Sequence, residues 1–171
     1  MPQITGPLDQ LYTSKLRTSF GWMRTVSDGN SLVRLDWNQT GWHELDRPDH
    51  VSRETKLQLQ AFLDRRLKKF TLPLAPSGKN ATGRHWLNIM EKIPYGTVIS
   101  YAEFARFAGK PGAARAAGSS CANNPIPIIY PCHRVISTNG KLGNYGGGSH
   151  HNPMHLDNLK RKAKLIDLES C

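Results

Sequence analysis

The stretch Ser100-Tyr-Ala-Glu-Phe-Ala-Arg-Phe-Ala-Gly-Lys-Pro-Gly-Ala-Ala-Arg-Ala-Ala-Gly-Ser-Ser-Cys-Ala-Asn123 decides the fold of the second half of the chain. Its first four residues have the Ser-x-x-Glu spacing of a capping box, which predicts that a helix begins there. Gly109-Lys-Pro-Gly112 predicts a turn, and Ala113 to Asn123 predicts a further helix of small residues with Arg115 as its only charge. Helix, short turn and helix form a helix-turn-helix, in which small side chains would let the second helix approach a partner closely. A tightly packed internal helix explains the same composition equally well, and spacing alone leaves both readings open.

The first half of the chain predicts a small sheet followed by a helix. Leu11 to Trp37 mixes β-branched and aromatic residues around the turn Ser27-Asp-Gly-Asn30, as short antiparallel strands do. Apolar residues recur at helical intervals from Val51 to Phe70, and Pro73 is expected to end this helix. Leu74 to Gly83 is rich in turn-forming residues and predicts a linker, so we expect lobes over residues 1–78 and 79–171.

The predicted fold class is α+β. A small N-terminal antiparallel sheet with a helix is followed by a mainly helical C-terminal lobe that contains the helix-turn-helix and a cysteine turn. In this second lobe, Trp86 to Ile93 predicts a helix with a buried face, which Pro94-Tyr-Gly96 ends.

The formal net charge of +10 favours a polyanionic partner. A basic surface that only aids solubility explains the same number, and charge alone does not separate nucleic acid from membrane. No run approaches the roughly 18 apolar residues of a membrane helix, and the N-terminus does not read as a secretion signal. We expect no membrane partner and an intracellular location, the cytoplasm in a prokaryote or the nucleus in a eukaryote.

The three cysteines, Cys121, Cys132 and Cys171, are an odd count without a framework spacing. Such a count argues against a disulfide scaffold and for a reducing compartment. None belongs to a Cys-x-x-Cys pair, so a zinc site is not expected.

Cys132 follows Ile126-Pro-Ile-Ile-Tyr130, an apolar run bounded by prolines that predicts a buried strand. The thiolate is the reactive form of cysteine, and the neighbouring His133 is the candidate base that would produce it. Adjacent residues on an extended chain point to opposite sides, so a water between the two side chains is the more natural proton path. A Cys-His dipeptide alone is weak evidence, because free cysteines are more often inert core residues.

The residues around this dipeptide carry a more specific signal. Pro131-Cys-His-Arg134, with Asn124-Pro125 before it and Gly143-Asn-Tyr-Gly-Gly-Gly148 after it, resembles the active-site signature of the O6-alkylguanine-DNA alkyltransferases. The resemblance extends through Ile93-Pro-Tyr-Gly-Thr-Val-Ile-Ser-Tyr101 and Gly109 to Gly118, and covers about residues 86 to 150. The first lobe is similar to that family in layout only.

The resemblance implies a single-turnover DNA repair enzyme, a methylated-DNA-[protein]-cysteine S-methyltransferase. Such a protein flips an O6-alkylguanine out of the duplex, with O4-alkylthymine as a second candidate substrate, and moves the alkyl group irreversibly to a cysteine, here Cys132. It implies residues 79–171 as the DNA-binding and alkyl-transfer domain, duplex DNA as partner, no cofactor and a monomer.

The resemblance also implies roles for single residues. His133 is the water-mediated base, Asn124 braces the active-site turn, and Tyr101 presses on a phosphate and donates to the base. Arg115 is the finger that enters the duplex, on a helix whose Ala114 and Gly118 allow close approach. The base and alkyl pocket is assigned to Pro127, Val135, Tyr145 and the backbone of Gly146.

One expected residue is missing from the predicted set. The family orients its active-site histidine with a glutamate on the helix after the Gly-rich loop. In the segment from Met154 to Ala163, the position of that glutamate falls on Leu159, Lys160 or Lys162, and Asp157 is the nearest acid. The sequence therefore leaves open another acid, slower transfer, or a lesion-binding protein with impaired transfer. A cation beside Cys132 could also stabilise the thiolate directly.

Two other groups have competing explanations. His150, His151 and His155 could form a metal site, but Pro153 lies between them and a polar loop is favoured. Lys160-Arg-Lys162 with Lys164 could contact DNA phosphates, although short charge runs are usually solvated helix faces. Lys160 is expected to contact DNA because it follows the catalytic turn.

A thiol hydrolase unrelated to DNA is a further alternative function. It would leave the helix-turn-helix and Arg115 unexplained.

Overall fold

The computed structural model describes residues 11–38, 41–145 and 153–170. The chain forms two compact units, Met1–Gly78 and Lys79–Cys171. The first holds an antiparallel sheet with one helix and the second is mainly helical, so the predicted α+β class is confirmed. Within the described ranges, every helix is too short or too polar to span a lipid bilayer.

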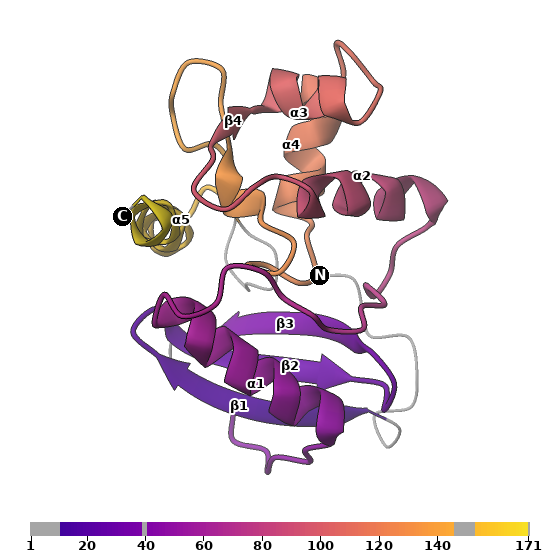
Figure 1. The fold of residues 1–171 in the computed structure, drawn as a ribbon, viewed down its shortest axis with the longest axis vertical. Coiled ribbons are helices and arrows are strands. Elements are labelled where there is room, and N and C mark those ends of the chain that lie inside the picture. Colours follow the sequence, from indigo (N-terminus) through magenta and orange to yellow (C-terminus); the bar gives the residue numbers. More distant parts are fainter. Residues whose placement is uncertain (1–10, 39–40, 146–152, 171) are drawn as a thin grey trace. The chain divides into compact units, whose positions relative to one another are not determined.

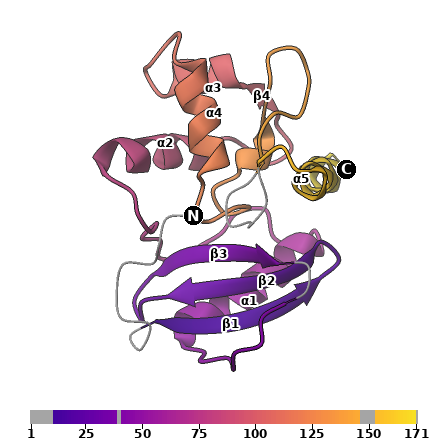
Figure 2. The same cartoon turned by 180° about the vertical axis from the view of Figure 1, so that it is seen from behind.

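The first unit is a three-stranded antiparallel sheet with a helix against it. Its elements are β1 (Tyr12–Thr18), β2 (Gly21–Ser27), β3 (Leu32–Asn38) and α1 (His50–Leu63), with strand order β1-β2-β3. Figures 1 and 2, drawn from opposite sides, both place α1 across one face of this sheet. Fully buried apolar residues from strands and helix form its core: Met23, Leu35, Trp37, Leu59 and Phe62. The predicted strands around the turn at Ser27 are therefore confirmed.

Helix α1 is fixed at its start by side chains. The carboxylate of Asp49 accepts from the backbone N–H of Ser52 at 2.8 Å, and the Ser52 hydroxyl accepts from the N–H of Asp49, which makes a capping box. The Ser27 hydroxyl also donates to Asp49 at 2.7 Å, which ties the helix start to β2.

The end of α1 differs from the prediction, because the helix stops at Leu63 and does not continue to Phe70. Arg65 adopts a left-handed backbone with φ 60°, at the position after the cap where glycine is usual. The chain then turns back, so that the centroid of the Phe70 ring lies 5.3 Å from that of the Phe62 ring. The apolar spacing continues through Phe70 although the helix does not, and without a glycine the sequence gives no stop signal there.

Replacing Arg65 by glycine is expected to raise the free energy of unfolding of the protein by about 0.5–1 kcal/mol. A left-handed backbone costs an L-residue about 1–2 kcal/mol, part of which the greater freedom of glycine in the unfolded chain cancels. Urea unfolding of the wild type and of Arg65→Gly measures the change. A lower stability of the variant would show that the arginine side chain itself holds this turn.

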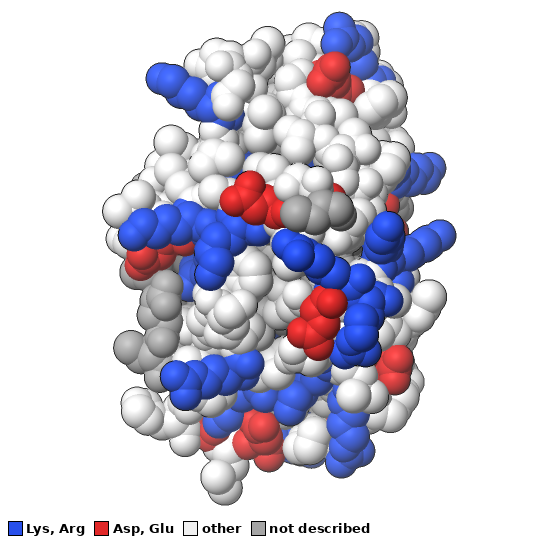
Figure 3. Space-filling view, turned by 60° about the vertical axis from the view of Figure 1, so that its left-hand side comes forward, with Lys and Arg blue, Asp and Glu red and all other residues white. Residues whose placement is uncertain are grey.

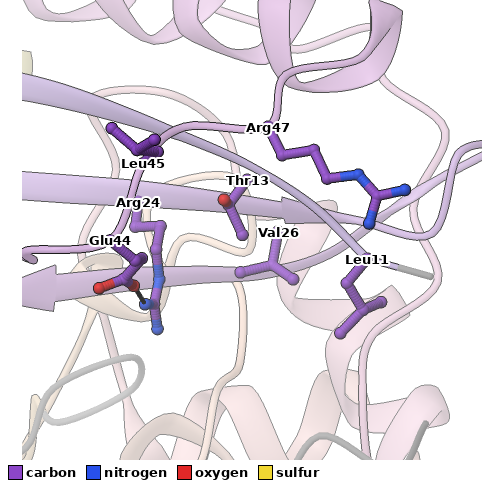
Figure 4. Close-up of a pocket in the computed structure, with 7 residues that line it drawn as sticks. All are labelled: Leu11, Thr13, Arg24, Val26, Glu44, Leu45 and Arg47. Atoms are coloured by element: carbon purple, nitrogen blue, oxygen red, sulfur yellow. Dashed lines mark hydrogen bonds and ion pairs between the residues drawn. The ribbon is translucent and has the colours of Figure 1, made fainter. Parts of the chain in front are cut away.

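A hollow of about 390 Å³ lies beside β1 and β2 of the first unit, where the guanidinium of Arg24 pairs with Glu44 (Figure 4). Its other lining residues are Leu11, Thr13, Val26, Leu45 and Arg47. None of these side chains pairs a nucleophile with a base, so this hollow does not have the groups of an active site for nucleophilic catalysis.

The second unit contains the predicted helix-turn-helix. Its elements are α2 (Ala81–Glu91), β4 (Ile99–Ser100), α3 (Tyr101–Phe107), α4 (Ala114–Ala122), the 3-10 turn η2 (Cys132–Arg134), β5 (Val135–Ile136) and α5 (Leu156–Glu169). The capping box between Ser100 and Glu103 is present and begins α3 as predicted. Helices α3 and α4 lie against each other around the turn (Figures 1 and 2).

A two-residue parallel sheet joins the helix-turn-helix to the cysteine turn. Ile99 of β4 pairs with Val135 of β5, and Ser100 pairs with Ile136. Because Tyr101 follows β4 directly and Cys132 precedes β5 by three residues, this pairing brings the two side chains to one region.

The predicted strand over Ile126–Tyr130 is wrong. The segment is a tight turn in which the N–H of Tyr130 donates to Ile126 O at 3.0 Å. Ile128 has φ 73°, an unfavourable backbone for a β-branched residue. An apolar run predicts burial, which is correct here, but it does not distinguish a strand from a turn between prolines. Strain of this kind often accompanies a functional site.

Candidate active site

Cys132 begins the 3-10 turn η2 and its side chain is fully buried. The amide nitrogen Nδ2 of Asn124 donates to Cys132 Sγ at 3.2 Å. Burial raises the pKa of the thiol, while the Asn124 hydrogen bond and the nearby Lys162 act in the opposite direction. At neutral pH Cys132 is therefore mainly a thiol that requires a base.

Asn124 holds the turn that carries this cysteine. Its Nδ2 also donates to Tyr130 O at 2.7 Å, and its Oδ1 accepts from the N–H of Ile126 at 3.0 Å. One buried amide thus binds both ends of the turn and the sulfur. This is the position at which the resemblance implies a residue that holds the active-site turn.

His133 is buried and points its Nε2 at a carboxylate, 2.7 Å from Glu169 Oε1. Burial lowers the pKa of His133, and the hydrogen bond that His133 donates to Glu169 only partly opposes this effect. The ring is therefore neutral with its proton on Nε2, because an ionised carboxylate can only accept. His133 Nδ1 is buried without a hydrogen-bond partner among the residues that the structure describes. That nitrogen is left with a lone pair for a proton.

Glu169 corrects the expectation that the relay glutamate is absent. Besides His133, it accepts from Arg134 Nη2 at 2.7 Å and Nε at 2.9 Å, and from the N–H of Gly96 at 3.1 Å. Burial by itself would raise the pKa of Glu169, but the bonds from His133 and Arg134 lower it to about 2. The carboxylate is therefore ionised throughout the neutral range.

The expectation failed because it placed the helix too early in the sequence. Helix α5 runs to Glu169, several residues beyond the segment ending at Ala163 in which the glutamate was sought. Asp157 lies 12 residues before Glu169, about 18 Å along a helix at 1.5 Å per residue, so it cannot take this role. The missed signal is the seven-residue interval from Lys162 to Glu169, which puts both on one helix face.

Lys162 is the second residue whose place the sequence did not settle. Its ammonium is fully buried and donates to Val135 O at 2.6 Å, to Asn144 O at 3.0 Å and to Leu142 O. Burial lowers the pKa of Lys162, whereas the charges of Cys121 and Cys132 would raise it. This cation fastens the loop before Tyr145 to β5 and acts on the sulfur through space.

Tyr101 is half-buried and its hydroxyl accepts from the N–H of Asn144 at 2.8 Å. Burial raises the pKa of Tyr101, which keeps the phenol protonated. Gly143 has φ 73°, and a Cβ there would lie 2.3 Å from the Tyr101 hydroxyl oxygen. Glycine is thus required for this contact, which leaves the phenol proton available to another acceptor.

The residues assigned to DNA contact lie on three helices, with Tyr101 at the start of α3 and the others on α4 and α5. Arg115 is exposed in the first turn of α4, Ala114 beside it is half-buried, and Lys160 is exposed on α5. Gly118 is buried and has Tyr101 and Asn144 nearest to it, so it faces these two residues and not solvent.

The residues assigned to the base and alkyl pocket, Pro127, Val135 and Tyr145, are all buried. The carbonyl of Val135 accepts from Lys162, and the carbonyl of Cys132 accepts from the N–H of Val135. Each of these two oxygens keeps a second lone pair. Gly146 lies outside the described residues.

Among the residues that the structure describes, no group of His, Cys, Asp and Glu side chains could hold a metal ion. His155 is the N-cap of α5 and accepts from the N–H of Asp157 at 3.2 Å. His150 and His151 lie outside the described residues.

The second unit matches a known family model. Residues 82–171 match the DNA binding domain of 6-O-methylguanine DNA methyltransferase. A methylated-DNA--protein-cysteine methyltransferase of Methanosarcina acetivorans is 46% identical over 144 residues, which are 81% of this chain and 91% of that protein. The protein of that name from Bacillus subtilis, described as constitutive, is 32% identical over 88% of this chain and 95% of its own.

Solved structures agree with the sequence relatives. The crystal structure of Mycobacterium tuberculosis OGT in complex with DNA matches with a TM-score of 0.76 at 32% identity, over 91% of each chain. A crystal structure of Mycobacterium tuberculosis O6-methylguanine methyltransferase matches with a TM-score of 0.77 at 27% identity, over 94% of this chain and 93% of the other.

Proposed function

The chain belongs to the O6-methylguanine DNA methyltransferase family, and we propose that it repairs duplex DNA by moving the alkyl group of an O6-alkylguanine to Cys132 Sγ. The observation that carries this assignment is the buried chain of contacts from Asn124 through Cys132 and His133 to Glu169. It combines a nucleophile, an adjacent base with a free nitrogen, and a carboxylate that fixes the tautomer of that base.

The proton leaves Cys132 by way of His133. Because the thiol pKa is raised, the sulfur needs a base at the moment of attack, and His133 Nδ1 is the buried acceptor. A water between Sγ and Nδ1 passes the proton, since neighbouring residues do not present their side chains to each other. The imidazolium that forms is stabilised by Glu169, 2.7 Å from Nε2.

Transfer then exchanges one bond for another. The Cys132 sulfur attacks the alkyl carbon, the bond from that carbon to O6 breaks, and its electron pair remains on the base. Tyr101 donates its free phenol proton to the developing charge, and the neighbouring carbonyls of Cys132 and Val135 accept from the guanine amine. The product is a thioether, which no group at the site can cleave, so each chain acts once and needs no cofactor.

The base must leave the stack before it reaches the sulfur. Extrusion costs a few kcal/mol, which contacts to the rest of the duplex offset. Arg115, exposed at the start of α4, fills the space that the base vacates. The protein acts as a monomer inside the cell, on O6-alkylguanine and also on O4-alkylthymine.

A lesion-binding protein with impaired transfer is not favoured. That alternative depended on the absence of the relay glutamate, and Glu169 occupies that place.

Incubation with a duplex that carries radiolabelled O6-methylguanine is expected to label the wild type once per chain. Cys132→Ala should accept no label, because the attacking sulfur is gone. The matched control is Cys121→Ala, which removes the other free thiol that is buried in the described part of the chain and should be labelled like the wild type. Label on Cys132→Ala, or repeated turnover by the wild type, would refute the proposal.

A further inference from the structure

Four cations crowd the chain where α1 ends. Arg65, Arg66, Lys68 and Lys69 fall within five consecutive positions, and all four are exposed. We call these four residues the α1-end patch. Figure 3 shows a face of the molecule on which Lys and Arg outnumber Asp and Glu and gather in groups. The acid next to the patch is Asp64, whose carboxylate pairs with Arg66 at 3.0 Å.

The backbone beneath these cations is firmly held. The N–H groups of Arg66 and Leu67 both donate to Ala61 O, at 2.8 and 3.1 Å. The packed rings of Phe62 and Phe70 close the turn. The cations therefore project from a fixed turn, which reduces the backbone entropy that binding would cost.

The patch extends onto the sheet of the same unit. Arg17 is exposed at the end of β1 and lines a hollow of about 360 Å³ together with Gln60 and Leu63 of α1 and the cap residue Asp64. A fifth cation thus lies across this hollow from the helix end.

Helix electrostatics explain only part of this arrangement. Cations are favoured near the carboxyl end of a helix, but the effect fades within the last turn. Lys68 and Lys69 lie beyond that turn, and Arg65 stands at a left-handed position that suits glycine. Crowded like charges repel one another, and a polyanion relieves that repulsion.

We propose that the α1-end patch binds the phosphate backbone of double-stranded DNA, in addition to the contacts made by the helix-turn-helix unit. The choice of DNA rests on the proposed function, which brings the protein to duplexes. A protein partner fits less well, since such interfaces have an apolar centre. Among the described residues from 60 to 70, no large apolar side chain is exposed.

The test compares two variants that lose equal charge from the same segment. Lys68→Gln with Lys69→Gln alters the patch. Arg53→Gln with Lys56→Gln is the control, at least nine residues, or about 13 Å along the helix, before Arg65. Binding to an unmodified 30-base-pair duplex is measured as a function of salt concentration. Each lost phosphate contact makes the negative slope of log K against log salt shallower by about 0.9 and weakens binding about eightfold at 0.1 M salt.

The patch variant should lose between one and two such contacts, and the control should keep the wild-type slope. Equal slopes in all three proteins, or equal losses in both variants, would overturn the proposal. Transfer from free O6-benzylguanine should proceed at the wild-type rate in both variants, which shows that fold and site are intact. Failure of the wild type to react with that base would refute the proposed function and leave the salt measurement valid.

Discussion

Replacement of Glu169 by Gln is expected to slow alkyl transfer about 10²- to 10⁴-fold. The amide can donate to His133 Nε2, which favours the tautomer with the proton on Nδ1 and removes the base for Cys132. It also withdraws the negative charge that stabilises the imidazolium. Single-turnover transfer from a lesion-bearing duplex measures the rate.

The matched control is Asp167→Asn, which removes an exposed carboxylate two residues earlier in α5. It should transfer at nearly the wild-type rate. Glu169→Gln also weakens the buried contacts with Arg134, so the rates are compared well below the unfolding temperature of each variant. A rate for Glu169→Gln within threefold of the wild type would contradict the relay.

The pH dependence of stability and of alkyl transfer follows from the pair formed by Glu169 and His133. The pKa of Glu169 is lowered to about 2 in the folded protein, below its ordinary value of 4.5. Its contribution to stability is thus complete above about pH 4.5 and is lost as pH falls towards 2. Burial also lowers the pKa of His133, so the base stays neutral, and transfer persists, to lower pH than a free imidazole would allow.

Replacement of Lys162 by Met is expected to slow transfer about 10- to 100-fold at pH 7. The ammonium acts to lower the pKa of the Cys132 thiol, so its loss should raise that pKa and reduce the tendency of the sulfur to ionise. Three carbonyls also lose their donor, which should loosen the loop that holds Asn144 against Tyr101. The rate with free O6-benzylguanine, measured from pH 6 to 10, reports both the rise in the thiol pKa and the loosening of the loop.

Lys160→Met is the control, because Lys160 is an exposed lysine on the same helix. It should leave the rate with the free base unchanged. If Lys162→Met kept the pH profile of the wild type and lost only stability, the cation would have a purely structural role.

Local signals predicted most of the fold. The capping box at Ser100, the β-branched and aromatic residues before Trp37 and the Gly-containing turn before α4 each act over a few residues, and each was correct. The errors lie where backbone geometry departs from residue preference. Arg65 and Ile128 adopt left-handed backbones without being glycine, so the end of α1 and the turn before Cys132 could not be read from composition.

The grouping of residues around Cys132 was predictable, but the electrostatics of the site was not. Cys132, His133 and Asn124 are close in sequence, and one turn brings them together. Glu169 lies 36 residues from His133 in the sequence. Which residue of α5 comes to lie beside His133 depends on where that helix begins. The roles of Glu169 and Lys162 therefore depend on tertiary packing, which a pattern of neighbours does not contain.

The mass spectrum of the protein after exposure to O6-benzylguanine shows whether Cys132 is the acceptor of the alkyl group. We expect an added mass of one benzyl group per chain, located on the peptide that contains Cys132, with no further increase at longer times. An adduct on Cys121, more than one adduct, or an unmodified protein with released benzyl alcohol would contradict this expectation.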